Sequence, residues 1–162
     1  MLAQVAAPAT AVRALEELFG YWAGLRRPGR LPSRADIDPN RFKRHLPTVS
    51  LIDVIPAPLS FRQRLAGTGL YALHRREITG LTLEQAYGEQ EAPYWRAELE
   101  AVVQRRRPGV GLRSLAARDT GDLSVLWLRL PLASDGERVD MILGYDAVIG
   151  SPRAMATGIR AA

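Results

Sequence analysis

LSVLWLRLPL at residues 123–132, followed by the pair Asp135-Gly136 and by RVDMILGYDAVI at 138–149, predicts a long β-hairpin. Alternate residues of the first segment fall into two sets, as they do on the two sides of a strand. One face carries Leu126, Leu128, Leu130 and Leu132, and the other carries Val125, Trp127 and Arg129. An Asp-Gly pair between two apolar segments is a strong signal for a tight turn. The last part of the chain is therefore expected to form two antiparallel strands.

Three earlier segments also have the composition of strands. SLIDVI at 50–55 is apolar and rich in β-branched residues, and FRQRLAGT at 61–68 has alternating side chains. The Pro56-Ala57-Pro58 sequence between them permits a turn but not a continued ladder, so the two segments are expected to pair as a hairpin. GLRSLAARDT at 111–120 is a further predicted strand.

Helical patterns occupy the start and the middle of the chain. Apolar residues recur at helical spacing between Thr10 and Pro28-Gly29, which predicts an amphipathic helix over 10–27. The middle predicts short helices at 69–80 and 81–89, and a longer one at 93–107 with Pro93 in its first turn. Strands and helices are segregated along the chain, which favours an α+β fold with a mostly antiparallel sheet.

The composition is that of one folded domain. The chain has 162 residues, of which 47% are hydrophobic and 24% are charged. We expect a flexible N-terminus at 1–9, the helix at 10–27, a folded domain at 28–150 and a flexible tail at 151–162. No apolar stretch is long enough for a membrane span, the start lacks a signal-peptide pattern, and cysteine is absent. These features predict a soluble cytoplasmic protein.

The net charge is +5, and every basic residue except Lys43 is an arginine. A basic surface attracts nucleic acid. Here the arginines are spread along the whole chain and most have acidic neighbours, which argues against nucleic-acid binding. The densest cluster is Arg105, Arg106 and Arg107, directly before Pro108.

The order of elements, two strands, short helices, one longer helix and three strands, resembles that of a PAS domain. Five segments carry the resemblance: LPSRADIDP at 31–39, LPTVSLIDV at 46–54, FRQRLAGT at 61–68, REITGLTLEQAY at 76–87 and LRLPLASDGERVDMILG at 128–144. Together they are similar to the small single-domain PAS proteins of proteobacteria. The resemblance implies a five-stranded antiparallel sheet with helices on one face. It also implies a sensor or adaptor in bacterial signalling, and not an enzyme.

PAS domains commonly hold a small molecule between sheet and helices, or dimerise through a helix that precedes the first strand. The helix at 10–27 fits the second role, and we expect a homodimer through its apolar stripe, Leu15, Leu18, Phe19 and Trp22. Packing of this stripe on the chain's own sheet would give the same pattern, so both arrangements stay open. A ligand-free module that acts through dimerisation alone is the alternative function.

Candidate contacts to a small molecule are Arg64, Tyr71, His74, Tyr87 and Tyr94. Tyrosine rings stack on ring-bearing ligands while their hydroxyls orient them, and arginine binds anions with two parallel hydrogen bonds. Each candidate also has a structural interpretation. The aromatic side chains can fill the core, and an arginine of this strand can form a cross-strand ion pair with Asp53.

No catalytic or metal site is expected. The two histidines, His45 and His74, are far apart in sequence, and the carboxylates are not clustered. Residues 93–107 contain no histidine to bind haem, and the lack of cysteine excludes a cysteinyl flavin adduct. The identity of any cofactor is left open. A small enzyme that uses His74 as an acid or base is a weaker alternative.

Overall fold

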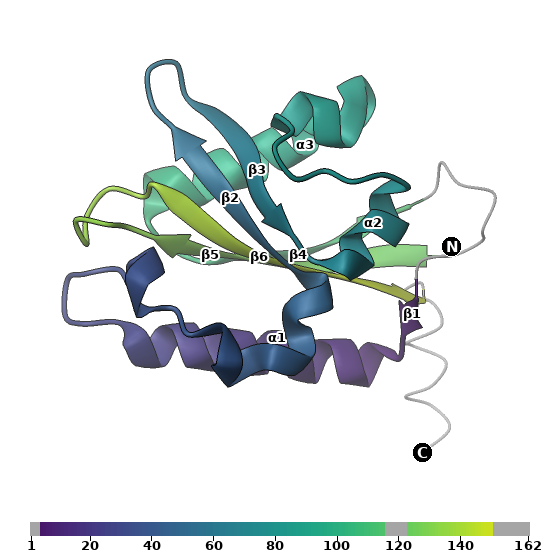
Figure 1. Ribbon diagram of the computed structural model, residues 1–162, viewed down its shortest axis with the longest axis horizontal. Coiled ribbons are helices and arrows are strands. Elements are labelled where there is room, and N and C mark those ends of the chain that lie inside the picture. The colour runs from purple at the N-terminus through teal and green to yellow at the C-terminus, as the bar shows by residue number, and fades with distance from the viewer. Residues whose placement is uncertain (1–3, 116–122, 151–162) are drawn as a thin grey trace.

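One β-sheet organises the part of the chain that the computed structural model describes, residues 4–115 and 123–150 (Figure 1). Its strands are β1 (Val5–Ala6), β2 (Val49–Ile55), β3 (Ser60–Ala66), β4 (Gly109–Ser114), β5 (Leu123–Leu132) and β6 (Met141–Gly150). The helices are α1 (Pro8–Leu25), α2 (Thr68–His74) and α3 (Leu83–Arg105), with the 3-10 helices η1 (Arg34–Asp36) and η2 (Pro39–Thr48). This element order confirms the predicted α+β fold.

The main strands lie in the order β3-β2-β6-β5-β4, and each neighbouring pair is antiparallel. β5 and β6 pair from Leu123 opposite Gly150 to Leu132 opposite Met141, which confirms the predicted hairpin. β6 begins at Met141 instead of at 138, because the carboxylates of Asp135 and Asp140 accept backbone hydrogen bonds within the preceding turn. The pairing of β2 with β6 stops at Tyr145, which lies opposite Val49, the first residue of β2. Beyond that point the short β1 pairs in parallel with β6.

The predicted hairpin of 50–55 with 61–68 is also present, as β2 and β3. β3 ends at Ala66, because Thr68 already starts α2. β4 begins at Gly109, and the end of the strand predicted to 120 lies outside the described residues, as do 1–3 and 151–162 of the predicted flexible ends. The prediction of a loose segment up to residue 9 is wrong for the described part, since Val5–Ala6 pairs with β6.

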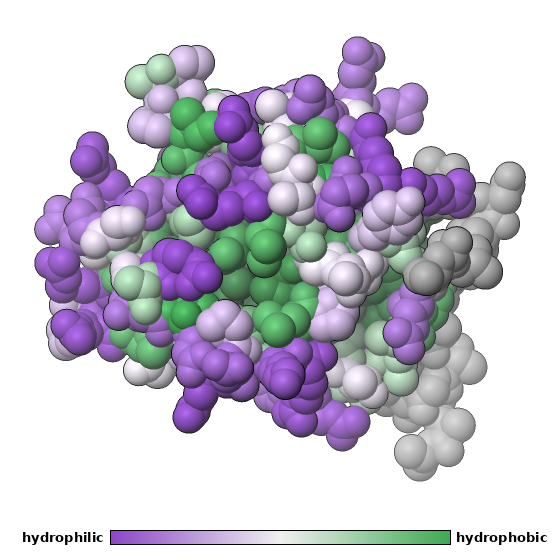
Figure 2. Space-filling model, in the orientation of Figure 1, coloured by the Kyte–Doolittle hydropathy of each residue, from purple (hydrophilic) through white to green (hydrophobic). Residues whose placement is uncertain are grey.

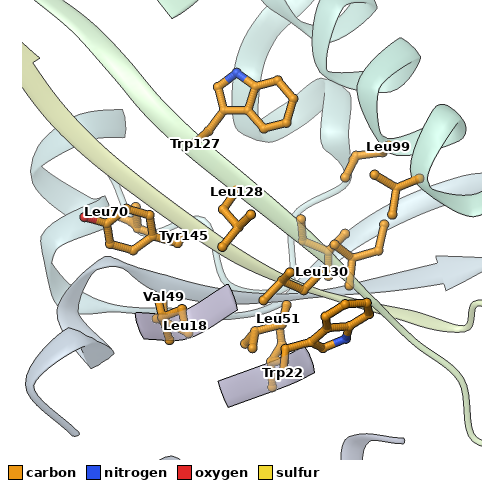
Figure 3. Close-up of a cluster of buried hydrophobic side chains, with 14 of the residues drawn as sticks. Leu18, Trp22, Val49, Leu51, Leu70, Leu99, Trp127, Leu128, Leu130 and Tyr145 are labelled. Atoms are coloured by element: carbon orange, nitrogen blue, oxygen red, sulfur yellow. The ribbon is translucent and has the colours of Figure 1, made fainter. Parts of the chain in front are cut away.

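The two faces of the sheet carry different helices. α1 lies along one face, which we call the outer face, and α2 and α3 lie on the opposite, inner face (Figure 1). Figure 3 shows the division at side-chain level: Trp22 and Leu18 of α1 lie on one side of the strands, and Trp127 and Leu99 lie on the other. Leu128 and Leu130 of β5 therefore pack towards α1, while Trp127 packs towards α3. The strand is buried along both faces for this reason.

α1 packs on the sheet of its own chain. Leu18 and Trp22 are each only 1% exposed. The indole Nε1 of Trp22 donates to the carbonyl of Pro131 at 2.9 Å, and the hydroxyl of Tyr145 donates to the carbonyl of Ala11 at 3.2 Å. Burying one such large apolar side chain contributes roughly 1.5–3 kcal/mol to folding.

The expected partner surface therefore needs correction. Leu18 and Trp22 cannot contact another protein in this arrangement, because their own sheet covers them. Leu15 is half-buried and packs against the core, and Phe19 is 43% exposed. Of the four stripe residues, Phe19 presents the largest free apolar surface.

α3 unites the two predicted helices at 81–89 and 93–107. Its start is capped reciprocally, because Thr82 Oγ1 accepts from the Gln85 amide and Gln85 Oε1 accepts from the Thr82 amide. The irregularity lies at Gly88, whose φ of 77° is outside the helical region, and not at Pro93. The helix predicted at 69–80 is shorter, since α2 ends at His74 and the next residue, Arg75, has a left-handed conformation. Among the described residues, no helix has the length and apolar character needed to cross a bilayer.

Candidate functional site

Aromatic side chains fill the space between α3 and the inner face of the sheet. We call Tyr87, Tyr94, Trp95 and Trp127 the aromatic cluster. The rings of Tyr87 and Trp95 stack with centroids 5.0 Å apart, and Trp95 meets Trp127 edge-on at 5.7 Å. The indole Nε1 of Trp127 donates to the hydroxyl of Tyr94 at 3.0 Å. The two tryptophans are almost fully buried, so this region is a packed core.

Two glycines of β4 make room for this cluster. A Cβ atom at Gly111 would lie 2.7 Å from the ring of Trp127, and one at Gly109 would lie 3.3 Å from it. Separations below 3 Å force a shift of one partner. The indole therefore lies directly over the backbone of β4, which explains why this strand carries glycine at alternate positions.

A buried ion pair lies beside the aromatic cluster. Arg129 of β5 donates from Nη2 to Oδ1 of Asp146 on β6 at 2.8 Å, and the side chains are 1% and 4% exposed. Arg129 Nη1 also donates to the carbonyls of Leu128 at 3.0 Å and Tyr145 at 3.1 Å. The guanidinium carbon is 5.0 Å from the ring centre of Trp95. The pair is thus enclosed by protein and held by several contacts.

Burial governs the ionisation of the groups around this pair. Loss of hydration is the largest influence on the pKa of Arg129 and opposes its charged form. The charge and hydrogen bond of Asp146, together with Tyr87, outweigh it, so the pKa of Arg129 is raised. Burial, and then the charge of Asp146, raise the pKa of Tyr87 far above its usual value. Within the described residues, Arg129 Nε and Gln63 Oε1 are buried without a hydrogen-bond partner. The inner face therefore carries a fixed charge pair and two unsatisfied polar atoms.

A groove of about 1260 Å³ opens at the end of the sheet where β2 stops and β1 takes its place beside β6. α1, η2 and α2 form its walls. Its apolar lining includes Ala11, Ala14, Leu70, Leu73 and Val148. Asp146 also belongs to the lining, so the groove lies beside the residue that supplies the carboxylate of the buried ion pair, although that side chain is only 4% exposed.

Charged side chains surround the groove. Glu17 of α1 bonds to Arg44 and to His45 of η2, each at 2.6 Å, and this joins two walls. Those two hydrogen bonds, from His45 first and Arg44 second, lower the pKa of Glu17. His45 Nε2 thus bonds to the carboxylate of another helix. Arg13 and Glu77 also line the groove and form no ion pair within the described residues.

Residues 10–146 match a family model described as "PAS domain". The chain belongs to the PAS domain family. A search of curated proteins found no match. Among solved structures, this PAS domain is similar to a light-oxygen-voltage domain studied with a flavin analogue, with a TM-score of 0.51, 14% identity, and 75% of this chain and 90% of that chain covered.

Further solved structures that the same comparison found include the following two. One is the LOV protein of Rhodobacter sphaeroides, with a TM-score of 0.47, 16% identity, and coverage of 75% of this chain and 76% of that one. The other is the PAS domain of a protein from Colwellia psychrerythraea, with a TM-score of 0.45, 12% identity, and coverage of 68% and 96%.

The residues of this PAS domain do not fit a flavin on the inner face. Trp95 and Trp127 occupy the space between α3 and the sheet, and both are buried. The chain also has no cysteine with which a flavin could form an adduct. Figure 2 shows apolar side chains gathered in the middle of the face in view, with hydrophilic ones around them.

The five predicted ligand contacts of this PAS domain do not converge. Tyr71 lines the groove and is 51% exposed. His74, Tyr87 and Tyr94 belong to the inner side: His74 meets Tyr87 edge-on at 4.9 Å, and Tyr94 bonds to Trp127. Arg64 lies outside the groove.

The cross-strand interpretation of Arg64 is the correct one. Arg64 Nε donates to Oδ1 of Asp53 at 2.7 Å, and the arginine side chain is 58% exposed. This hydrogen bond raises the pKa of Arg64. Because β3 is the edge strand of the sheet, the long side chain reaches solvent.

The sequence analysis did not identify Arg129 and Asp146 as the buried ion pair of the PAS domain. The sequence does indicate such a pair, since each is a charged residue inside an apolar strand of ten residues. Such a residue is buried only when it is paired. The pairing itself could not be inferred, because it depends on the register that brings Arg129 opposite Gly144, beside Asp146.

Proposed function

We propose that the chain is a PAS-type sensory domain that binds a small molecule in the groove between α1, η2 and α2. The observation that carries the proposal is the groove itself, which opens between α1, η2 and α2 and has Asp146 of the buried ion pair in its lining. A ligand there would lie next to an ion pair that the protein has already desolvated and positioned. Differential binding to two states of the domain would then shift its signalling equilibrium.

The lining defines the chemistry of the ligand. The walls are largely apolar, and Arg13 and Glu77 supply charges that are free of ion pairs within the described residues. A small molecule with an apolar body and at least one charged group would satisfy both features. Tyr71 is placed to cover such a body with its ring. The proposed role is binding and signalling in the cytoplasm, without catalysis.

A ligand-free interaction module is the second candidate. The filled inner face favours it, because the space between α3 and the sheet holds Trp95 and Trp127 instead of a cavity. In that case the domain would act through contacts with a second copy or another protein. Phe19, at 43% exposure, would take part in such a contact.

Native mass spectrometry tests the ligand. We expect a bound compound, or a thermal shift with members of a metabolite panel, in the wild-type protein. Thr10→Trp should abolish binding, because Thr10 lines the groove. Ala9→Trp is the matched control, since its neighbouring position on α1 is exposed but does not line the groove. Equal binding by both variants would contradict the proposed location.

The same samples separate the alternatives. No bound compound and no thermal shift, together with self-association in sedimentation equilibrium that Phe19→Ser weakens, would support the ligand-free module instead. Turnover of a metabolite that is lost in His74→Ala would contradict a purely non-catalytic role.

A further inference from the structure

A basic hollow lies away from the groove, at the other end of α1. Its volume is about 680 Å³, and the C-terminal half of α1, the loop after it, the end of α3 and the start of β4 line it. We call its five arginines, Arg26, Arg30, Arg105, Arg106 and Arg107, the arginine patch. The lining contains no acidic residue among the described part of the chain. Five like charges from separate elements thus meet on one surface.

The positive charge of the arginine patch is not neutralised within the described residues. Their seven ion pairs include none of these five arginines. Arg30 donates to the carbonyl of Asp135 at 2.6 Å, and Arg106 donates to the carbonyls of Gly29 at 3.4 Å and Gly136 at 3.3 Å. These neutral acceptors hold the two guanidinium groups in place and leave their charge available.

Helix capping accounts for only part of this arrangement. Cations near the C-terminus of a helix stabilise it by about 0.3–1 kcal/mol, which explains a basic residue at the end of α3. The same effect applies to Arg26, the C-cap residue of α1, but not to Arg30, which lies in the loop beyond it. The guanidinium of Arg26 also lies 5.2 Å from the ring centre of Trp22. Two arginines therefore join the patch from another part of the chain.

Exposed apolar side chains border the arginine patch. Phe19 and Val110 line the hollow and are 43% and 59% exposed. Leu112, two residues further along β4 and hence on the same face of that strand, is 44% exposed. Large apolar residues next to arginines without an ion pair form a surface that can bind both carboxylates and apolar side chains.

We infer that the arginine patch docks an acidic segment of a partner protein, with an apolar side chain of that segment on Phe19 and Val110. Carboxylates match the planar fork of arginine and bind it with two hydrogen bonds. The aliphatic Val110 in this border favours a peptide over duplex nucleic acid, whose bases are paired inside the helix and whose phosphate backbone carries no apolar side chain. The inference goes beyond the ligand groove and does not depend on it.

Selection from a displayed library of random 12-residue peptides tests the inference without a known partner. We expect peptides selected on the wild-type protein to be enriched in Asp and Glu and to contain a large apolar residue. Arg105→Glu/Arg107→Glu should lose this enrichment, whereas Arg41→Glu/Arg76→Glu should retain it. The two control arginines are exposed, lie outside the patch and form no ion pair within the described residues. The control variant changes the net charge by the same amount as the patch variant.

Affinity measurements on the selected peptides complete the test. The patch variant should weaken binding at least tenfold and reduce its salt dependence, while circular dichroism shows a retained fold. Phe19→Ser should weaken binding to the peptide and leave binding to a 20-base-pair DNA unchanged. Selection without acidic enrichment, equal loss in the control variant, or tighter binding of DNA than of every selected peptide would overturn the inference.

Discussion

Asp146→Asn should destabilise the fold by about 3–5 kcal/mol, because it leaves Arg129 charged and buried without its counter-ion. The burial of both side chains supports this magnitude. Arg129 is 1% exposed and Asp146 5%, so water cannot replace the lost carboxylate. Arginine is not deprotonated in proteins, so the guanidinium stays charged in the variant instead of relieving the cost. For a domain of this size, with a typical stability of about 5–15 kcal/mol, the loss is large and measurable.

Urea unfolding followed by tryptophan fluorescence is the assay. Trp95 lies beside the ion pair, with its ring centre 5.0 Å from the guanidinium carbon, so it reports on this region directly. The double variant Arg129→Met/Asp146→Leu should recover most of the lost stability, because it removes both charges together. This second variant keeps the test informative if the single variant does not fold.

Asp53→Asn is the matched control for charge removal. Its partner Arg64 is 58% exposed, and a surface pair of this kind contributes below about 1 kcal/mol. Equal free-energy losses for Asp146→Asn and Asp53→Asn would refute the argument from burial. A double variant as unstable as the sum of its single variants would show that the two charges do not depend on each other.

Three further perturbations have expected outcomes. Gly111→Ala should destabilise by about 1–3 kcal/mol and change the near-UV circular dichroism, because its Cβ would lie 2.7 Å from the ring of Trp127; an unchanged spectrum would count against the close approach. Trp22→Ala should cost about 3–5 kcal/mol in a concentration-independent unfolding transition, whereas a stable chain that merely loses dimers would contradict packing on its own sheet. Glu17 has a folded-state pKa below 4.5, so the stability from its hydrogen bonds is present above that pH and lost as the pH falls through the lowered value. Glu17→Gln should therefore flatten the acid limb of the stability curve, and Glu16→Gln should not.

Local sequence determined the elements of this protein. Alternating apolar residues and the Asp135-Gly136 turn predicted the β5–β6 hairpin, and apolar spacing predicted α1, because these patterns depend only on neighbours along the chain. Resemblance then added the arrangement of the elements as a PAS domain. The helix break at Gly88 instead of Pro93 shows the limit of such patterns, since both residues disfavour a helix and the backbone conformation decides between them.

Contacts between distant segments were decided only by the tertiary structure. The sequence left open whether Trp22 meets a partner or its own sheet, and the fold buries it against Pro131. Asp146 is paired to Arg129 by strand register, and the groove beside it exists because β2 ends where β1 begins. The arginine patch likewise joins residues from α1 and α3. Such sites depend on which segments meet in space, and a pattern of neighbours along the chain does not contain that information.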